Sequence, residues 1–148
     1  MSRLPVIPAD ELDERQRRIH DAMISGKQGG FRGPFPMWVH SAGYLEVIEK
    51  VATYLRYDST LPPRLNEMAI LITARFWTSQ YEWFAHEPRA LKAGLDPAII
   101  ASIAGRRRPE NMKPDEEALY NFCTELHETH AVSDAVSRQP PRSSVKTA

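Results

Sequence analysis

Apolar residues recur at spacings of three and four along most of this 148-residue chain, which is the period of an α-helix. No segment alternates apolar and polar residues for long enough to indicate a strand. The clearest stripe runs from Tyr44 to Tyr57 and consists of Leu45, Ile48, Val51, Ala52 and Leu55. The pattern therefore predicts an all-α fold.

Capping residues, glycines and prolines divide the rest of the pattern into further helices. These are expected at residues 10–26, with Asp10 as the N-cap, at 62–77, 79–93 and 96–105, and from Pro114 onward. The buried faces are expected to carry Leu12, Ile19, Ala22 and Met23 in the first of these helices, Leu65, Met68, Ala69, Ile72 and Phe76 in the second, and Ala118, Leu119, Phe122, Cys123 and Leu126 in the last.

One domain is expected over residues 1–136, because no linker separates two composition classes. The glycine- and proline-rich segment 27–38 is predicted to be a loop, with Phe31, Phe35 and Trp38 lining a pocket or a subunit contact. Residues 137–148 lose the apolar period and are rich in proline, serine and basic residues. We expect them to form a disordered tail.

Charge and hydropathy exclude several classes of function. Lysine and arginine number 19, as do aspartate and glutamate, so the chain has no basic footprint for nucleic acid or an anionic membrane. The run 106–108 of three arginines lies between a glycine and a proline and is expected to be a solvated loop. No stretch reaches the ~18 to 20 apolar residues of a membrane span, and the N-terminus lacks the apolar core of a signal peptide. A cytoplasmic location is predicted.

Cysteine chemistry is restricted because Cys123 is the single cysteine. One thiol can form neither an intrachain disulfide, nor a C-x-x-C redox pair, nor a thiolate zinc site by itself. Cys123 lies on an apolar helix face, where a small hydrophobic role is expected.

Candidate acid–base residues cluster in the segment 62–95. Glu67 lies on one predicted helix, and Glu82 and His86 lie four residues apart on the next, so this carboxylate and imidazole share a face. A neighbouring carboxylate favours the imidazolium and burial opposes it, which leaves a group able to exchange protons near neutral pH. The three residues are therefore the candidate catalytic set.

Substrate binding is assigned to Arg75, Tyr81 and Trp83. Arg75 follows Glu67 by two helical turns, and its planar guanidinium suits an anionic substrate. Tyr81 and Trp83 start the same helix as His86, although tryptophans such as Trp83 more often belong to a core.

Structural alternatives exist for the candidate site. The sequence Ser79-Gln-Tyr-Glu82 has the form of a capping box, so Glu82 could serve only as a helix cap, and His86 could serve only as a bridge between helices. Glu67, Glu82 and His86 are metal ligands by type, but the H-E-x-x-H motif is absent, and no metal is expected. The pair His127-x-x-His130 is expected on a solvated face.

The same segment resembles the core of the carboxymuconolactone decarboxylase family, which includes the AhpD-type alkylhydroperoxidases. The matching features are LPPR before the first helix, the glutamate of LNEMAILITAR, the helix start TSQYEW, the histidine of AHE and the exit ALKAGL. At the level of helix order the resemblance covers about residues 4 to 136, and it implies an AhpD-like helical domain.

In the AhpD branch a glutamate, a C-x-x-C pair and a histidine form a proton relay. Glu67 and His86 match that glutamate and histidine, whereas Ser79 and Glu82 stand where the two cysteines would be. Without a thiolate nucleophile, a peroxide has nothing to oxidise productively. The resemblance thus implies the fold and pocket of the family but argues against peroxide reduction.

The leading hypothesis is a lyase of the carboxymuconolactone decarboxylase type, acting on a small carboxylate or lactone without a cofactor. His86 is expected to be the general acid or base, Glu82 to orient it, Glu67 to relay a proton and Arg75 to hold a carboxylate. The alternatives are an AhpD-like alkylhydroperoxidase and a non-catalytic oligomeric binding domain. The resemblance also implies a homo-oligomer, either a dimer, a trimer or a hexamer. From charge and hydropathy, no nucleic-acid or membrane partner is expected.

Overall fold

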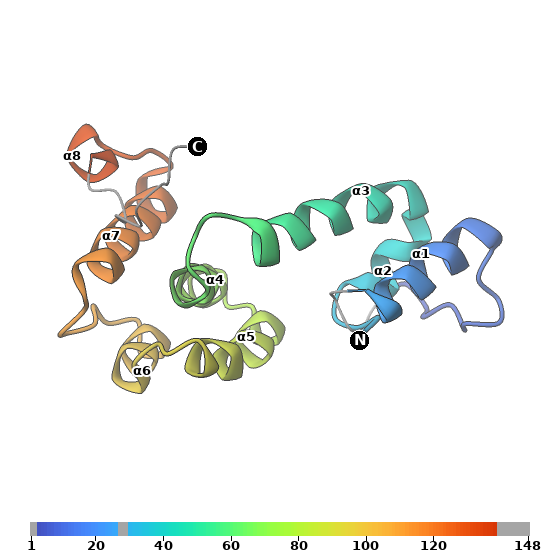
Figure 1. Cartoon of the computed structure of the whole chain (residues 1–148), viewed down its shortest axis with the longest axis horizontal. Coiled ribbons are helices and arrows are strands. Elements are labelled where there is room, and N and C mark those ends of the chain that lie inside the picture. The colour runs from blue at the N-terminus through green and yellow to red at the C-terminus, as the bar shows by residue number, and fades with distance from the viewer. Residues whose placement is uncertain (1–2, 27–29, 139–148) are drawn as a thin grey trace. The chain divides into compact units, whose positions relative to one another are not determined.

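The computed structural model describes residues 3–26 and 30–138, and within these ranges every regular element is a helix (Figure 1). The all-α prediction is confirmed. The chain divides into two compact units, Met1–Ser59 and Thr60–Ala148, both of which contribute to the expected domain 1–136. The candidate acid–base residues all belong to the second unit.

The first unit contains α1 (Glu14–Ser25), α2 (Phe35–Trp38), the 3-10 helix η1 (Val39–Ser41), α3 (Ala42–Thr53) and the π-helical turn η2 (Tyr54–Asp58). The start predicted for α1 at Asp10 is wrong. Asp13 is the N-cap, because it forms a reciprocal capping box with Gln16, and this box satisfies two backbone N–H groups at once.

The core of the first unit consists of Leu12, Ile19, Met23, Val39 and Leu45. Phe31, Phe35 and Trp38 are half-buried and pack against this core. The inward stripe expected from Tyr44 to Tyr57 is only partly correct. Leu45 is buried and Ile48 packs against the core, but Val51 and Leu55 are exposed.

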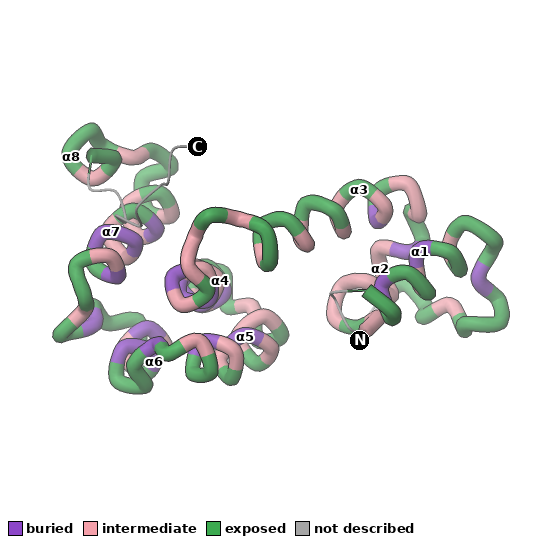
Figure 2. Tube along the Cα trace, in the orientation of Figure 1, coloured by how far each residue is buried: buried purple, intermediate pink, exposed green. Residues whose placement is uncertain are grey.

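The second unit contains α4 (Pro63–Phe76), α5 (Gln80–Lys92), α6 (Pro97–Ala104), α7 (Pro114–Thr129) and the short α8 (Asp134–Ser137). Helix α4 is central and packs against α5, α6 and α7, and α8 packs on α7 (Figure 1). Purple, buried stretches accordingly concentrate where these helices face α4 (Figure 2). This packing places the residues of α4 at the centre of the unit.

Most of the residues that were expected to face inward do lie in the core of this unit, including Leu65, Met68, Ile72, Leu119 and Cys123. Three expectations are wrong: Phe76, Phe122 and Leu126 are exposed. Phe76 is the last residue of α4, and Phe122 and Leu126 belong to α7. The helical period correctly identified a stripe, but neighbouring helices cover only part of its width.

A buried ion-pair network joins the start of α4 to the start of α7. Arg64 Nη1 donates to Oε1 of Glu116, and Arg64 Nη2 lies 2.6 Å from Oδ2 of Asp115. The other carboxylate oxygen of Glu116 accepts a hydrogen bond from the backbone N–H of Lys113. Local sequence patterns do not reveal this network, because Arg64 and Glu116 are 52 residues apart.

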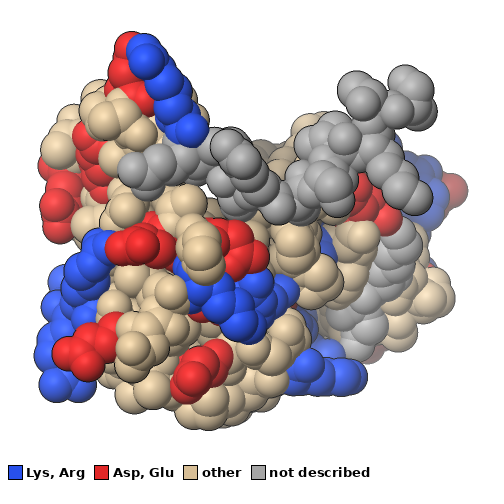
Figure 3. Space-filling view, turned by 60° about the vertical axis from the view of Figure 1, so that its left-hand side comes forward, with Lys and Arg blue, Asp and Glu red and all other residues tan. Residues whose placement is uncertain are grey.

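The predicted tail 137–148 lies mostly outside the described residues. Ser137 ends α8, Arg138 follows it, and residues 139–148 are not described. Among the described helices, none combines the length and apolar character needed to cross a membrane. On the face shown in Figure 3, acidic and basic side chains are interspersed, as the equal numbers of the two charges suggest.

Candidate active site

The centre of the candidate site is a buried pair between helices α4 and α5. Nδ1 of His86 lies 2.6 Å from Oε2 of Glu67, and the two side chains are only 2% and 11% exposed. An ionised Glu67 fixes the imidazole tautomer with a proton on Nδ1, which donates to the carboxylate. Nε2 is then the ring atom that can take up or release a proton.

Glu82 lies on the other side of the imidazole. Its Oε2 is 3.5 Å from Nε2 of His86, one helical turn away, and its side chain is 39% exposed. The three residues therefore form a chain from the interior to the surface, in the order Glu67, His86 and Glu82. The structure brings together the catalytic set predicted from the sequence.

The capping box predicted at the start of α5 is wrong. Ser79 is the N-cap, but its side chain makes no capping hydrogen bond. Glu82 lies beside His86 instead, because the i and i+4 positions of a helix share a face. Helix capping therefore does not account for Glu82, and its interaction with His86 is the one that the structure supports.

A largely apolar pocket opens beside Glu82. It has a volume of about 360 Å³ and is lined by Ala69, Ile70, Thr73, Ala74, Trp77, Ser79 and Glu82. Glu82 is its only ionisable lining residue. A small organic molecule bound there would meet the carboxylate of Glu82 before it could reach the buried imidazole of His86.

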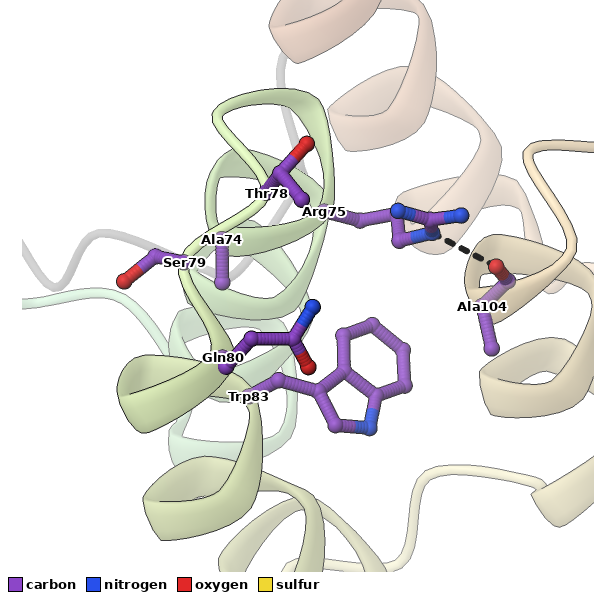
Figure 4. A pocket seen from close by; sticks show the side chains of 7 residues that line it. All are labelled: Ala74, Arg75, Thr78, Ser79, Gln80, Trp83 and Ala104. Atoms are coloured by element: carbon purple, nitrogen blue, oxygen red, sulfur yellow. Dashed lines mark hydrogen bonds between the residues drawn. The ribbon is translucent and has the colours of Figure 1, made fainter.

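The predicted substrate-binding residues are not brought to this pocket. Arg75 and Trp83 line a different pocket of about 260 Å³, which shares Ala74 and Ser79 with the first (Figure 4). Nε of Arg75 donates to the backbone carbonyl of Ala104 at 2.6 Å, so the guanidinium points toward α6 (Figure 4). Tyr81 is exposed and lines neither pocket.

Trp83 has a structural role as well. Its ring packs against the core of the second unit, and its indole Nε1–H donates to Oε2 of Glu87 at 3.2 Å. The direction of the Arg75 side chain depends on how α6 packs, and that of Trp83 depends on how α5 packs. Residue spacing along the chain does not specify how these helices pack.

Of the two histidines predicted on a solvated face, one differs from expectation. His127 is half-buried rather than solvated: its ring stacks on Phe76 at 4.7 Å, and Nε2 lies 3.1 Å from Oγ1 of Thr73. His130 is exposed, as expected for a solvated face. In the described part of the chain, no three His, Cys, Asp or Glu side chains are arranged to hold a metal ion.

Cys123 is buried in the core of the second unit, as expected for a small hydrophobic residue. Burial raises the pKa of its thiol to about 11. A thiol with this pKa is almost entirely protonated at neutral pH, and the thiolate is the nucleophilic form. Cys123 therefore cannot replace the missing C-x-x-C pair.

Comparisons of the chain with models of protein families, with curated proteins and with solved structures find no match. The resemblance to the carboxymuconolactone decarboxylase family therefore stays a prediction, and any assignment of activity depends on the geometry of the site.

Proposed function

We propose that this chain is a lyase of the carboxymuconolactone decarboxylase type that acts on a small carboxylate or lactone by acid–base chemistry. The observation that carries the proposal is the chain Glu67–His86–Glu82, which leads from a buried carboxylate to a pocket of about 360 Å³. Decarboxylation of a substrate with a neighbouring unsaturated lactone needs a proton donor for the resulting carbanion, and no external electron sink.

Within this proposal the two glutamates exchange the roles expected from the sequence. Glu67 forms the short, buried bond to Nδ1 of His86, which makes it the residue that orients the imidazole. Glu82 lines the pocket and lies beside Nε2, which makes it the group that meets the substrate. A proton then passes between substrate and Glu82, with His86 as its reservoir.

Arg75 holds no substrate carboxylate in this proposal, because it lines another pocket. The anionic end of the substrate would instead lie toward the hydroxyls of Ser79, at the start of α5, and of Thr73, in the last turn of α4, which both line the pocket. A helix N-terminus favours negative charge.

The test is release of carbon dioxide from carboxymuconolactone, the substrate in the name of the family. Glu82→Gln should lower kcat by ~10² to 10⁴, the usual contribution of an acid–base group, while the melting temperature stays close to that of the parent. Tyr81→Phe, which changes an exposed residue outside the pocket, serves as the control. Absence of turnover in the parent chain, or full turnover in Glu82→Gln, would refute the proposal.

The homo-oligomer is also a proposal, and one observation favours it. Trp77 and Phe84 on the α4–α5 pair are 67% and 77% exposed, and large apolar side chains in such positions commonly belong to interfaces. Further copies of this chain covering them would form a dimer, a trimer or a hexamer. A monodisperse monomer in sedimentation would contradict the proposed homo-oligomer.

A cytoplasmic location likewise stays a prediction from the sequence.

A further inference from the structure

A third cavity lies in the second unit, where the C-terminal ends of α4 and α6 meet the middle of α7. Its volume is about 200 Å³. It shares no lining residue with the pocket of Glu82, and neither Glu67 nor His86 lines it. The residues that line it come from α4, from α6 and the loop after it, and from α7, so that three separate parts of the chain build one site.

Three arginines, Arg75, Arg106 and Arg107, are among the residues that line this cavity. None of the three forms an ion pair with a carboxylate of the described residues. One carboxylate, that of Glu128, also lines the cavity. Three fixed positive charges against one negative charge favour an anionic occupant.

Neighbouring arginines of the same unit behave differently. Arg64 binds Asp115 and Glu116, and Arg108 lies 2.6 Å from Oε1 of Glu117. Carboxylates are therefore close at hand in this part of the fold, yet the arginines of the cavity are not paired with them. The arginine run 106–108 is an exposed loop, as expected from the sequence; Arg106 and Arg107 also line the cavity, and Arg108 forms a surface ion pair.

Two of the cavity arginines are held in place by hydrogen bonds that leave most of the guanidinium available. Nε of Arg75 donates to the carbonyl of Ala104 at 2.6 Å, and Nη2 of Arg106 donates to Oγ1 of Thr78 at 2.9 Å. A guanidinium carries five N–H donors, so each retains donors for a ligand. Positioned donors lose less conformational entropy on binding than freely moving ones.

Apolar and aromatic side chains form the rest of the cavity. Ile72 and Ile103 come from the core of the unit, and Phe76 and His127 stack against each other with ring centroids 4.7 Å apart and planes 14° apart. Tyr120 adds a third aromatic ring, with Arg108 over its face at 5.3 Å. An occupant therefore meets flat apolar walls together with guanidinium groups.

We propose that this cavity binds a small aromatic carboxylate, with the carboxylate on the guanidinium groups of Arg106 and Arg107 and the ring against Phe76 and the two isoleucines. A planar guanidinium pairs with a carboxylate through two parallel hydrogen bonds. Aromatic rings in turn stack on flat walls of this kind. A cavity of about 200 Å³ accommodates one ring with its substituent rather than a nucleotide.

The backbone of Arg106 makes a clean test possible. Its φ of 55° lies in the left-handed region, which a glycine adopts without strain and an arginine does not. Arg106→Gly therefore removes the guanidinium and relieves the backbone at the same time. Loss of binding in this variant cannot be attributed to a damaged fold if its melting temperature is retained.

The experiment is calorimetric titration of the full chain with benzoate as the probe. The double variant Arg106→Gly, Arg107→Ala should bind benzoate at least tenfold more weakly than the parent. Arg138→Ala should bind it as the parent does, because Arg138, the residue after α8, does not line the cavity. Benzyl alcohol, which keeps the ring but lacks the charge, should bind the parent at least tenfold more weakly than benzoate.

Three results would overturn this proposal. The first is the absence of benzoate binding to the parent at 10 mM (about 10⁴ times a typical 1 μM affinity). The second is equal affinity in the parent and the double variant, which would place benzoate elsewhere. The third is inorganic phosphate binding as tightly as benzoate, which would show that the aromatic walls contribute nothing. The carbon dioxide assay does not involve this cavity, so the proposed lyase activity stands or fails separately.

Discussion

Nδ1 of His86 on α5 lies 2.6 Å from Oε2 of Glu67 on α4, so a buried carboxylate–imidazole pair joins two helices of the second unit. The spacing along the sequence predicts that His86 pairs with Glu82, yet the shorter contact of His86 is the one to Glu67 on the preceding helix. The pair thus contributes both to the site and to the packing of the two helices.

Breaking this pair should strongly destabilise the protein. His86→Leu leaves the carboxylate of Glu67 buried without its partner, and loss of one member of a buried pair typically costs about 3–5 kcal/mol. The double variant Glu67→Leu, His86→Leu should recover much of that loss, because no charge is then left buried. Urea unfolding of the parent, both single variants and the double variant measures the difference. If the double variant lost as much unfolding free energy as the two single variants together, the two side chains would have no coupling energy.

Helix caps offer a second prediction, because the structure distinguishes real caps from apparent ones. Oδ1 of Asp96 accepts from the backbone N–H of Ala98, whereas the Ser79 side chain caps nothing. Asp96→Ala should therefore lower the free energy of unfolding by about 0.5–2 kcal/mol, and Ser79→Ala should change it by only a few tenths. Thermal unfolding at neutral pH checks both. A large loss of unfolding free energy in Ser79→Ala would show that the Ser79 side chain does cap α5.

The Arg64–Glu116 ion pair should matter far more than the exposed Arg108–Glu117 pair. The Glu116 side chain is 2% exposed, whereas Arg108 and Glu117 are 51% and 54% exposed. Arg64→Ala leaves a buried carboxylate unpaired and should cost about 3–5 kcal/mol. Arg108→Ala is the matched control and should cost at most about 1 kcal/mol, since water screens exposed pairs. Similar losses in denaturant titrations of the two variants would contradict this distinction.

Alkaline pH should weaken the fold through Cys123. Burial raises the pKa of this thiol to about 11 from an ordinary value of 9.0, so above pH 9 the unfolded chain releases a proton that the folded chain keeps. The stabilisation from the neutral buried thiol is complete below pH 9 and is lost as the pH rises toward 11. In the parent, the free energy of unfolding should fall across this range more steeply than in Cys123→Ala. If the unfolding free energy fell equally steeply with pH in the parent and in Cys123→Ala, burial would not raise the pKa of this thiol.

Glu46 provides a prediction at acidic pH. Its hydrogen bond to Arg15, with the positive charge of that guanidinium, lowers the pKa of the carboxyl below its ordinary value of 4.5. The stabilising effect is present above the unfolded pKa and is lost as the pH falls through the folded pKa. Carboxyl chemical shifts followed through an acid titration should give Glu46 a midpoint below 4.5, and Arg15→Ala should return it toward that value. An unchanged midpoint in the variant would exclude Arg15 as the cause.

The sequence by itself determined the class of fold and the position of most helices. Hydrophobic spacing with local signals, such as Asp96 before Pro97, sufficed to place α4, α5, α6 and the start of α7. These features are local, because a helix forms its hydrogen bonds within four residues of each position. The pairing of Glu82 with His86 was predictable for the same reason.

Tertiary structure decided everything that joins distant segments. The bond from Glu67 to His86 spans 19 residues, that from Arg64 to Glu116 spans 52, and the hydrogen bond from Arg75 to Ala104 spans 29. Helical periodicity states which residues share a face, but not which neighbouring helix covers that face. Arg75 therefore looked like part of the acid–base site, although the packing of α6 directs it to another cavity. Side-chain direction at these positions depends on how helices pack, and no local pattern encodes that packing.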